Sequence, residues 1–259
     1  MSHRSQVFAE SSRPIGPQAR TGEGTLEIIV SGDIMLTLIT TLVLLSVHHY
    51  FYDASRILRR RSTSGEETQV RAVYAQRLWG VFWLALVPIA LGGARIQPRV
   101  LNLGILDWRP VLFLILSTVL IFIPIIYANS RQSTLWLTYP EIRSLSWNRR
   151  RHGLNALSWA GYLIAYEFLF RGYLLFGLAA YLEDWLAITI MTVIYVGAHY
   201  EKPRLEMLGC IPVGIVFGYV ALASGGIWGP VIAHILIAVS NDEFCQRQRL
   251  KSHPPALAS

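Results

Sequence analysis

Two residues of opposite charge interrupt a long apolar stretch in the C-terminal part of the sequence. Glu167 and Arg171 lie four positions apart in the segment Ala165–Gly172, whose other residues are uncharged. In a helix this spacing places both side chains on one face, where they can pair. A charge inside a membrane-spanning helix costs about 2.5–3.5 kcal/mol even on the lower scales, so it usually faces protein or a water-filled cavity. The pair therefore indicates a functional site, with helix packing by a self-neutralised ion pair as the alternative.

Two histidines lie in the apolar segments that follow this pair. His199 ends one segment, and His234 lies inside the last. Beside a carboxylate, imidazole can take a proton from water, donate one to a leaving group or bind a metal. Glu167, His199 and His234 would also form a zinc ligand set. We expect the three to converge on one site, although counting 1.5 Å per helical residue puts His234 about 10 Å shallower than Glu167.

The composition indicates that lipid surrounds most of the chain. Of its 259 residues, 53% are hydrophobic and 15% are charged, and the mean hydropathy is +0.41. In a soluble domain, about a quarter of the residues are charged. The net charge of +7 comes from short basic clusters between apolar runs, which favours a membrane topology signal over nucleic-acid binding.

The apolar runs predict an all-α, polytopic membrane helix bundle with about seven transmembrane helices. These are expected near residues 27–50, 78–95, 110–128, 153–182, 186–200, 207–223 and 227–243. The fourth run exceeds the length that a bilayer needs, so it should tilt, break near Gly172 or Gly177, or begin along the membrane surface. His48 and His49, at the end of the first run, are interpreted as interfacial residues.

Basic residues alternate between the loops in a way that predicts orientation. Sixteen of the 23 lysines and arginines fall in 53–77, 129–152, 201–206 and the tail after 243. This excess indicates the cytoplasmic side, and it predicts an outside N-terminus and a cytoplasmic C-terminus. The chain divides into a polar disordered tail (1–26), N-terminal spans with basic cytoplasmic loops (27–150), a core carrying the site (151–245) and a short polar tail (246–259).

Signatures of other intramembrane proteases are missing from the sequence. It contains no His-Glu-x-x-His zinc motif, no Gly-x-Ser nucleophile turn, no Gly-x-Gly-Asp motif and no phosphate-binding glycine loop. Cys210 and Cys245 have neither metal-type spacing nor a disulfide pattern.

The region from about 150 to 243 resembles the CPBP family, also called the Abi or CAAX-protease type. That group contains the prenyl-protein endoprotease that removes the last three residues after prenylation. Its pattern is Glu-Glu-x-x-x-Arg, then Phe-x-x-x-His, then His-x-x-x-Asn on successive helices. The matching segments here are Tyr166–Arg171, Tyr195–His199 and His234–Ala238, with a glycine-containing run and a Ser224-Gly225-Gly226 turn before the last.

Two positions depart from the family pattern. Tyr166 replaces the first glutamate, which in the family is thought to activate the attacking water, and Ala238 replaces the asparagine that assists the final histidine. A bacterial branch with a single motif glutamate is similar to this chain. Asn241, two turns after His234, and the adjacent Asp242 are candidates for the missing amide.

The resemblance implies an intramembrane endopeptidase in a multi-pass cell membrane, a bacterial inner membrane on this interpretation. Its partners would be the lipid bilayer and a membrane-associated protein or peptide substrate, with no nucleic acid. Glu167 and His199 would activate water, His234 would stabilise the oxyanion or bind metal, and Arg171 would orient Glu167. Glu206 is a spare carboxylate for a metal-dependent reaction. A non-catalytic membrane scaffold or binding protein with the same fold is the main alternative, and a proton-coupled transporter is a third.

Overall fold

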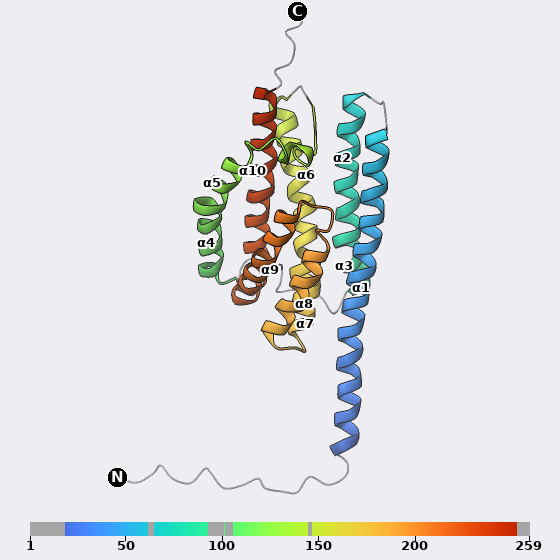
Figure 1. Cartoon of the computed structure of the whole chain (residues 1–259). Coiled ribbons are helices and arrows are strands. Elements are labelled where there is room, and N and C mark those ends of the chain that lie inside the picture. The colour runs from blue at the N-terminus through green and yellow to red at the C-terminus, as the bar shows by residue number, and fades with distance from the viewer. Residues whose placement is uncertain (1–18, 62–64, 93–100, 102–105, 145–146, 253–259) are drawn as a thin grey trace, which may run out of the picture.

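The structure is a computed structural model that describes residues 19–61, 65–92, 101, 106–144 and 147–252. Most of the predicted N-terminal tail lies outside these ranges, as does the end of the C-terminal tail. Every secondary-structure element in them is helical (Figure 1), which confirms the all-α class. The elements are α1 (Ala19–Arg61), α2 (Glu66–Val81), η1 (Phe82–Leu86), α3 (Val87–Gly92), α4 (Trp108–Ser117), η5 (Thr118–Phe122), α5 (Ile123–Asn129), η6 (Leu135–Leu137), α6 (Arg149–Glu167), η7 (Phe168–Leu175), α7 (Phe176–Ala179), α8 (Asp184–Gly197), α9 (Arg204–Ser224) and α10 (Trp228–Ser252).

Five helices in the described residues are long and apolar enough to cross a membrane. They cover Gly32–Asp53, Glu66–Leu91, Trp108–Asn129, Arg149–Ala179 and Arg204–Ser224. Helix α8 is apolar but shorter, and α10 carries charges along its second half. The chain is therefore a multi-pass membrane protein, whereas the count of seven spans and the orientation of the termini stay predictions.

The second span begins much earlier than predicted. The sequence suggested a basic loop over 53–77, but α1 continues to Arg61 and α2 begins at Glu66. Glu66 and Glu67 lie in the first turn of α2, where negative charge stabilises a helix N-terminus. Arg77 was counted with the loop, yet it lies inside the bundle at 3% exposure because neighbouring polar groups satisfy its charge.

The segment with Glu167 and Arg171 is one continuous helix, not one broken at either glycine. Helices α6, η7 and α7 together run from Arg149 to Ala179, and η7 is a π-helical stretch that begins directly after Glu167. Asn148 caps its start, with the side chain accepting a hydrogen bond from the Arg151 amide at 2.8 Å. Stretches of π-helix occur frequently at functional sites.

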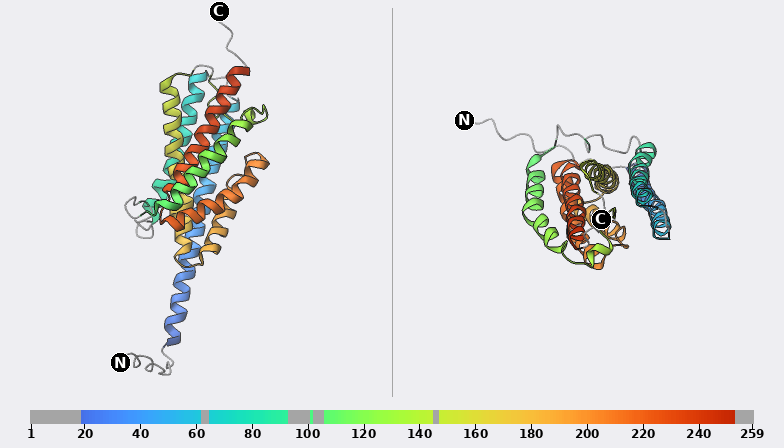
Figure 2. Two further views of the ribbon diagram at one scale, coloured as in Figure 1. Left: turned by 90° about the vertical axis from the view of Figure 1, so that its left-hand side faces the viewer. Right: turned by 90° about the horizontal axis from the view of Figure 1, so that it is seen from above.

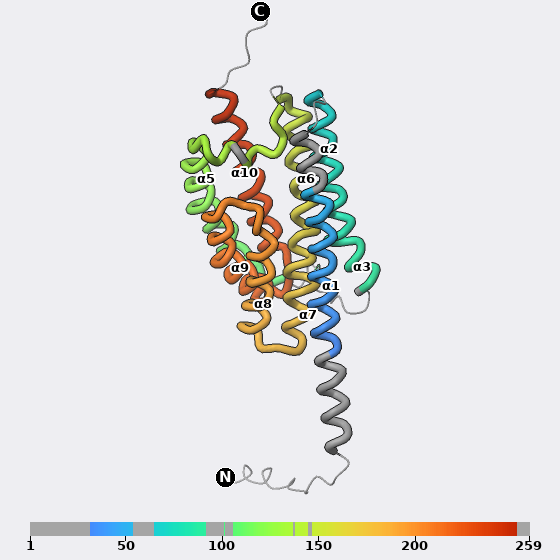
Figure 3. Tube along the Cα trace, turned by 45° about the vertical axis from the view of Figure 1, so that its right-hand side comes forward, coloured from blue at the N-terminus to red at the C-terminus, as the bar shows by residue number. Residues whose placement is uncertain are grey.

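The central layer of the bundle consists of α6 and α10. Figure 2 shows α4 and α5 on one side of this pair and α1 with α2 on the other, and Figure 3 shows α8 and α9 beside them at the end where α7 lies. The main hydrophobic core surrounds η7, whose eight residues are all buried. The motif residues of this helix are therefore held in the best-packed part of the molecule.

Small residues bring α8 and α9 close together. A Cβ built on Gly214 would meet the Thr192 side chain at 2.8 Å, so a larger residue there would push the two helices apart. Gly225 ends α9 in the left-handed conformation, with φ of 76°, and the chain reverses into α10 as the predicted turn requires.

Helix α10 extends past the predicted domain boundary at residue 245. It continues to Ser252, and Gln246 is buried with its amide donating to the Ser144 carbonyl at 3.1 Å. This contact gives a polar segment a partner inside the protein, so part of the predicted C-terminal tail belongs to the bundle.

Candidate active site

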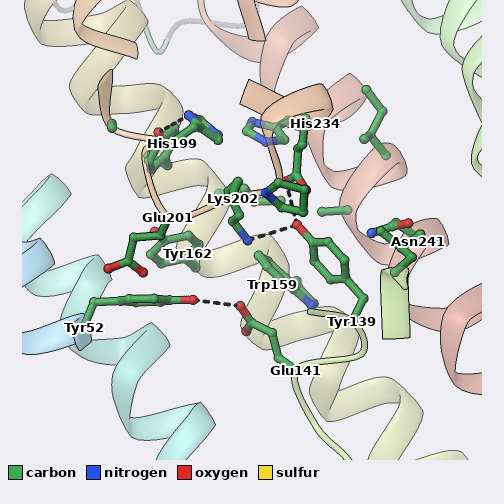
Figure 4. A pocket seen from close by; sticks show the side chains of 18 of the residues that line it. Tyr52, Tyr139, Glu141, Trp159, Tyr162, His199, Glu201, Lys202, His234 and Asn241 are labelled. Carbon is green, nitrogen blue, oxygen red and sulfur yellow. Dashed lines mark hydrogen bonds between the residues drawn. The ribbon is translucent and has the colours of Figure 1, made fainter. Parts of the chain in front are cut away.

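A cavity of about 530 Å³ lies inside the bundle. Its walls come from α1, α2, α5, α6, α9 and α10, from the 129–141 connection and from the turn between α8 and α9. Figure 4 shows His199 and His234 near each other on one side of it, with Lys202 and Tyr139 across from them. The two histidines predicted to share a site therefore border one space.

Glu167 connects two of the predicted site residues. Its Oε1 lies 2.6 Å from Nδ1 of His234, and Nη1 of Arg171 lies 3.1 Å from Oε1 and 3.0 Å from Oε2. Both side chains of the Glu167–Arg171 pair are fully buried. Carboxylates hold an imidazole in one tautomer and orientation, so Glu167 fixes His234 with Nδ1 as the donor.

His199 is fixed by the backbone. Its Nδ1 lies 2.8 Å from the Tyr195 carbonyl, which can only accept, so Nδ1 carries the proton in the neutral ring. Nε2 of His199 and Nε2 of His234 have no hydrogen-bond partner among the described residues, and both rings line the cavity. The site thus offers two imidazole nitrogens as proton acceptors.

Glu167 and Arg171 lie behind the cavity wall, while Tyr166 lines it. The Tyr166 hydroxyl is 3.5 Å from Nδ1 of His199, at the limit of a hydrogen bond. Tyr166, at the position of the family's first glutamate, therefore presents a phenol to the cavity. Glu167, the remaining carboxylate of the motif, is turned toward Arg171 and His234.

The predicted metal ligand set is not assembled in the structure. Among the described residues, no three His, Cys, Asp or Glu side chains are grouped so that they could hold a metal ion. The reason lies in the contacts above: Nδ1 of His234 faces Glu167, Nδ1 of His199 faces a carbonyl, and the Glu167 oxygens are paired with Arg171.

The depth difference of about 10 Å that counting residues gave does not keep His234 from Glu167, because its Nδ1 lies 2.6 Å from Oε1 of Glu167. The prediction counted helix rise along a common axis. Figure 1 shows that α10 and α6 are inclined differently through the bundle, so equal numbers of residues do not give equal depths.

Glu206 belongs to a second polar group on the cavity wall. Its Oε1 accepts a 2.7 Å hydrogen bond from the Tyr139 hydroxyl. The oxygen of that hydroxyl accepts a hydrogen bond from Nζ of Lys202 at 2.9 Å (Figure 4). Burial raises the pKa of Tyr139 well above its ordinary value of 10.0, and the Glu206 carboxylate raises it further. Tyr139 is therefore a neutral donor that holds Glu206 in place.

The two candidates for the missing amide lie in different places. Asn241 and Ala238 line the cavity with His234, and the Asn241 amide oxygen faces the Cys245 thiol at 3.8 Å. Asp242 is buried elsewhere, where it accepts hydrogen bonds from the Asn155 side chain at 2.7 Å and the Glu141 amide at 3.1 Å.

His48 and His49 are not simple interfacial residues, because both line the cavity. Nε2 of His48 lies 3.2 Å from the Tyr162 hydroxyl, and Nε2 of His49 lies 2.9 Å from the Ala198 carbonyl. The signal that could have identified them is helical spacing. Tyr52 and Asp53 follow the two histidines by four positions, which places a polar face on an otherwise apolar helix.

Residues 155–240 match the family model described as type II CAAX prenyl endopeptidase, Rce1-like. The match covers about a third of the chain and confirms the resemblance that the motifs indicated: this segment is similar to the CAAX-type intramembrane endopeptidases. It leaves α1 to α5 outside, and it does not address the bacterial branch or the single motif glutamate, which stay predictions. No curated protein and no solved structure matches the chain.

Proposed function

We propose that this protein is an intramembrane endopeptidase that hydrolyses a peptide bond of a membrane-associated protein or peptide inside the cavity. The observation that supports it is the pair of imidazoles in the family-matched segment, each fixed at Nδ1 and each with Nε2 free toward the same space. A positioned imidazole can transfer the protons of hydrolysis, and a second one can stabilise the charge that forms on the substrate.

His199 acts as the general base in this proposal. Its Nε2 accepts a proton from water while the water oxygen attacks the carbonyl carbon of the scissile bond, and it then delivers that proton to the departing amine. One water is consumed, one C–N bond breaks, and a carboxylic acid and an amine are released, which then exchange a proton to give a carboxylate and an ammonium group. Proton transfer by a positioned imidazole contributes about 10²–10⁴-fold to such a rate.

His234 stabilises the oxyanion that forms on the carbonyl oxygen. In its protonated form, Nε2–H donates to that oxygen while Nδ1–H remains on Glu167 at 2.6 Å. The Glu167 carboxylate stabilises this imidazolium, and Arg171 holds the carboxylate in position. Glu167, predicted from the sequence to activate water with His199, is thus a positioning residue in this mechanism because its side chain is fully buried behind the cavity wall.

A non-catalytic membrane scaffold or binding protein is the second candidate. Tyr166 favours it, because the wall beside His199 carries a phenol where the family pattern has a carboxylate. Against the scaffold, Glu206 lines the same cavity and is a candidate for the carboxylate that Tyr166 replaces. In the scaffold, the Glu167–Arg171–His234 group would serve packing alone.

The experiment is cleavage of prenylated and unprenylated membrane peptides by the full-length protein in lipid nanodiscs, with products identified by mass spectrometry and bound metal measured. His199→Ala should lower the rate by about 10²–10⁴-fold. His152→Ala is the matched control, since His152 contacts Glu243 at 2.7 Å and does not line the cavity. Tyr166→Glu should raise the rate by restoring a carboxylate. An absence of cleavage in the wild type and in Tyr166→Glu would favour the scaffold.

A further inference from the structure

The C-terminal half of α1 carries a polar face that contacts the turn before α9, inside the family-matched segment. His48, His49, Tyr52 and Asp53 form this face, and α1 lies wholly outside the family-matched residues 155–240. Elsewhere α1 presents large apolar side chains to its surroundings, with Met35 at 58% and Ile39 at 51% exposure. Polar side chains that point into the protein from such an apolar helix indicate a structural or functional role.

His49 reaches the turn that carries His199. Its Nε2 lies 2.9 Å from the carbonyl oxygen of Ala198, the residue directly before His199, and its Nδ1 lies 2.8 Å from the Leu45 carbonyl on its own helix. Both oxygens can only accept. A neutral ring satisfies one of them and an imidazolium satisfies both. The ring connects α1 to the turn when Nε2 carries a proton, as it does in the imidazolium and in one of the two neutral tautomers.

The same turn is held by α1 at a second residue. The Tyr200 ring packs against the His49 ring, with centroids 5.6 Å apart, and the Tyr200 hydroxyl donates to Oδ2 of Asp53 at 2.7 Å. The residues on both sides of His199 are therefore fixed to α1. The backbone of the turn is held by hydrogen bonds such as His199 N to the Val196 carbonyl at 3.0 Å and Lys202 N to the His199 carbonyl at 2.9 Å, and the Lys202 side chain bonds the Tyr139 hydroxyl at 2.9 Å.

We propose that His49 is a positioning residue for His199, which it holds against the cavity by bonding the Ala198 carbonyl. Its effect on catalysis rests on the endopeptidase function proposed above. The clamp, which is the contact between His49 and the Ala198 carbonyl, does not depend on that function. A general base must lie within hydrogen-bond reach of its water, and a misplacement of about 1 Å can cost about 10²-fold in rate. Helix α1 would thus complete a site whose reacting groups lie in the family segment.

The test compares two substitutions at one position. His49→Phe keeps an aromatic ring against Tyr200 and removes both N–H groups, whereas His49→Gln keeps an N–H donor at similar reach. Ser46→Ala is the matched control, because the exposed Ser46 hydroxyl bonds only the Leu42 carbonyl of its own helix. Hydrogen exchange of the full-length protein in nanodiscs reports on residues 196–203 without any need for activity.

We expect His49→Phe to exchange roughly fivefold faster in that peptide, the factor for losing one hydrogen bond, while His49→Gln and Ser46→Ala match the wild type. With an active wild type, kcat of His49→Phe should fall about 10–100-fold with KM unchanged, and His49→Gln should recover most of it. Unchanged exchange in His49→Phe, or equally fast exchange in His49→Gln, would overturn the clamp. An inactive wild type with the expected exchange would overturn the endopeptidase alone.

Discussion

Two buried arginines of the bundle stand in different polar networks. Arg77, on α2, donates to the Asn155 side chain at 2.8 Å, to the Ser158 hydroxyl at 2.7 Å and to Glu141 at 3.0 Å, and it lies 4.1 Å above the Trp159 ring. Asn155 in turn donates to Asp242 at 2.7 Å. This network joins α2, α6, α10 and the connection before α6.

Arg171 has far fewer polar partners. It contacts one carboxylate, and its Nε and Nη2 have no hydrogen-bond partner in the described part of the chain. The guanidinium instead lies 4.4 Å from the Tyr195 ring and 5.4 Å from the Phe217 ring. The carboxylate that it holds also binds His234, whose ring borders the cavity.

The difference separates a structural network from a candidate catalytic one. In the described part of the chain, Arg77 leaves Nε without a hydrogen-bond partner, whereas Arg171 leaves both Nε and Nη2. Arg77, on α2, divides its hydrogen bonds between α6 and the connection, and Asn155 extends the network to Asp242 on α10, so Arg77 stabilises the arrangement of the bundle. Arg171 concentrates its charge on Glu167, so it stabilises the orientation of one imidazole.

The largest expected effect comes from breaking the Arg77 network. Arg77→Met leaves Glu141 and Asp242 without the guanidinium, and breaking a buried ion pair in this way costs about 3–5 kcal/mol of the free energy of unfolding. Arg171→Met should cost less, because Arg171 bonds Glu167 alone whereas Arg77 bonds Asn155, Ser158 and Glu141. Chemical unfolding in detergent micelles measures both.

Arg71→Met is the matched control for this comparison. Arg71 lies on the same helix and pairs with Glu67 at 3.6 Å, with its side chain 79% exposed against 4% for Arg77. Exposed pairs of this kind contribute about 0–1 kcal/mol. A loss for Arg77→Met no larger than that for Arg71→Met would show that the network does not support the fold.

The two networks also differ in how far the sequence predicted them. The Glu167–Arg171 pair could be predicted because both residues lie on one helix at a spacing of four, inside an apolar run. The Arg77 network could not, because its members lie in segments far apart in the chain and Arg77 resembles any arginine of a basic loop. Only the packing of α2 on α6 gives it buried partners.

Parts of the candidate site could not be predicted from the sequence either, because they also depend on contacts between segments far apart in the chain. His199 and His234 were found as polar residues in apolar helices, but the spacing along the chain could not show that His234 reaches Glu167 across inclined helices. Lys202 was counted as a basic residue of the 201–206 loop, yet it lines the cavity and donates to Tyr139. Tertiary contacts alone decide which polar residues near a helix end point inward.

A double-mutant cycle tests whether Glu167 acts through His234, and its expected effect is smaller than that of breaking the Arg77 network. If Glu167 acts through His234, the loss of activity in Glu167→Gln/His234→Ala should be close to that of His234→Ala alone. The coupling energy in transition-state stabilisation is then about 1–3 kcal/mol, as for residues in direct contact. Steady-state cleavage rates in nanodiscs give each value.

The second cycle pairs His234→Ala with Arg77→Lys, which keeps a cation in the structural network. These two residues belong to different networks, so their effects on activity should add within about 0.3–0.5 kcal/mol. Additive effects for Glu167 and His234 would contradict the positioning role of Glu167. Strong coupling between Arg77 and His234 would contradict the division into two networks.

The smallest expected effect concerns Tyr139, which lies between the two networks on the cavity wall. Tyr139→Phe removes the hydrogen bonds to Glu206 at 2.7 Å and from Lys202 at 2.9 Å, at a cost of about 1 kcal/mol in the free energy of unfolding near neutral pH. Cleavage of the best substrate should change less than in His199→Ala, because Tyr139 holds Glu206 and does not bond either histidine.

The pH dependence distinguishes this hydrogen bond from simple packing. Burial, followed by Glu206, raises the pKa of Tyr139 above 10.0, so the folded protein keeps the phenolic proton at a pH where the unfolded chain releases it. The wild type should therefore lose stability as the pH rises through and above about 10, and Tyr139→Phe should lack that part of the loss. The gap between the two proteins then narrows with rising pH. No gap at pH 8 would show that the hydroxyl adds nothing to stability beyond the ring, and a constant gap from about pH 8 to 11 would contradict the raised pKa of Tyr139.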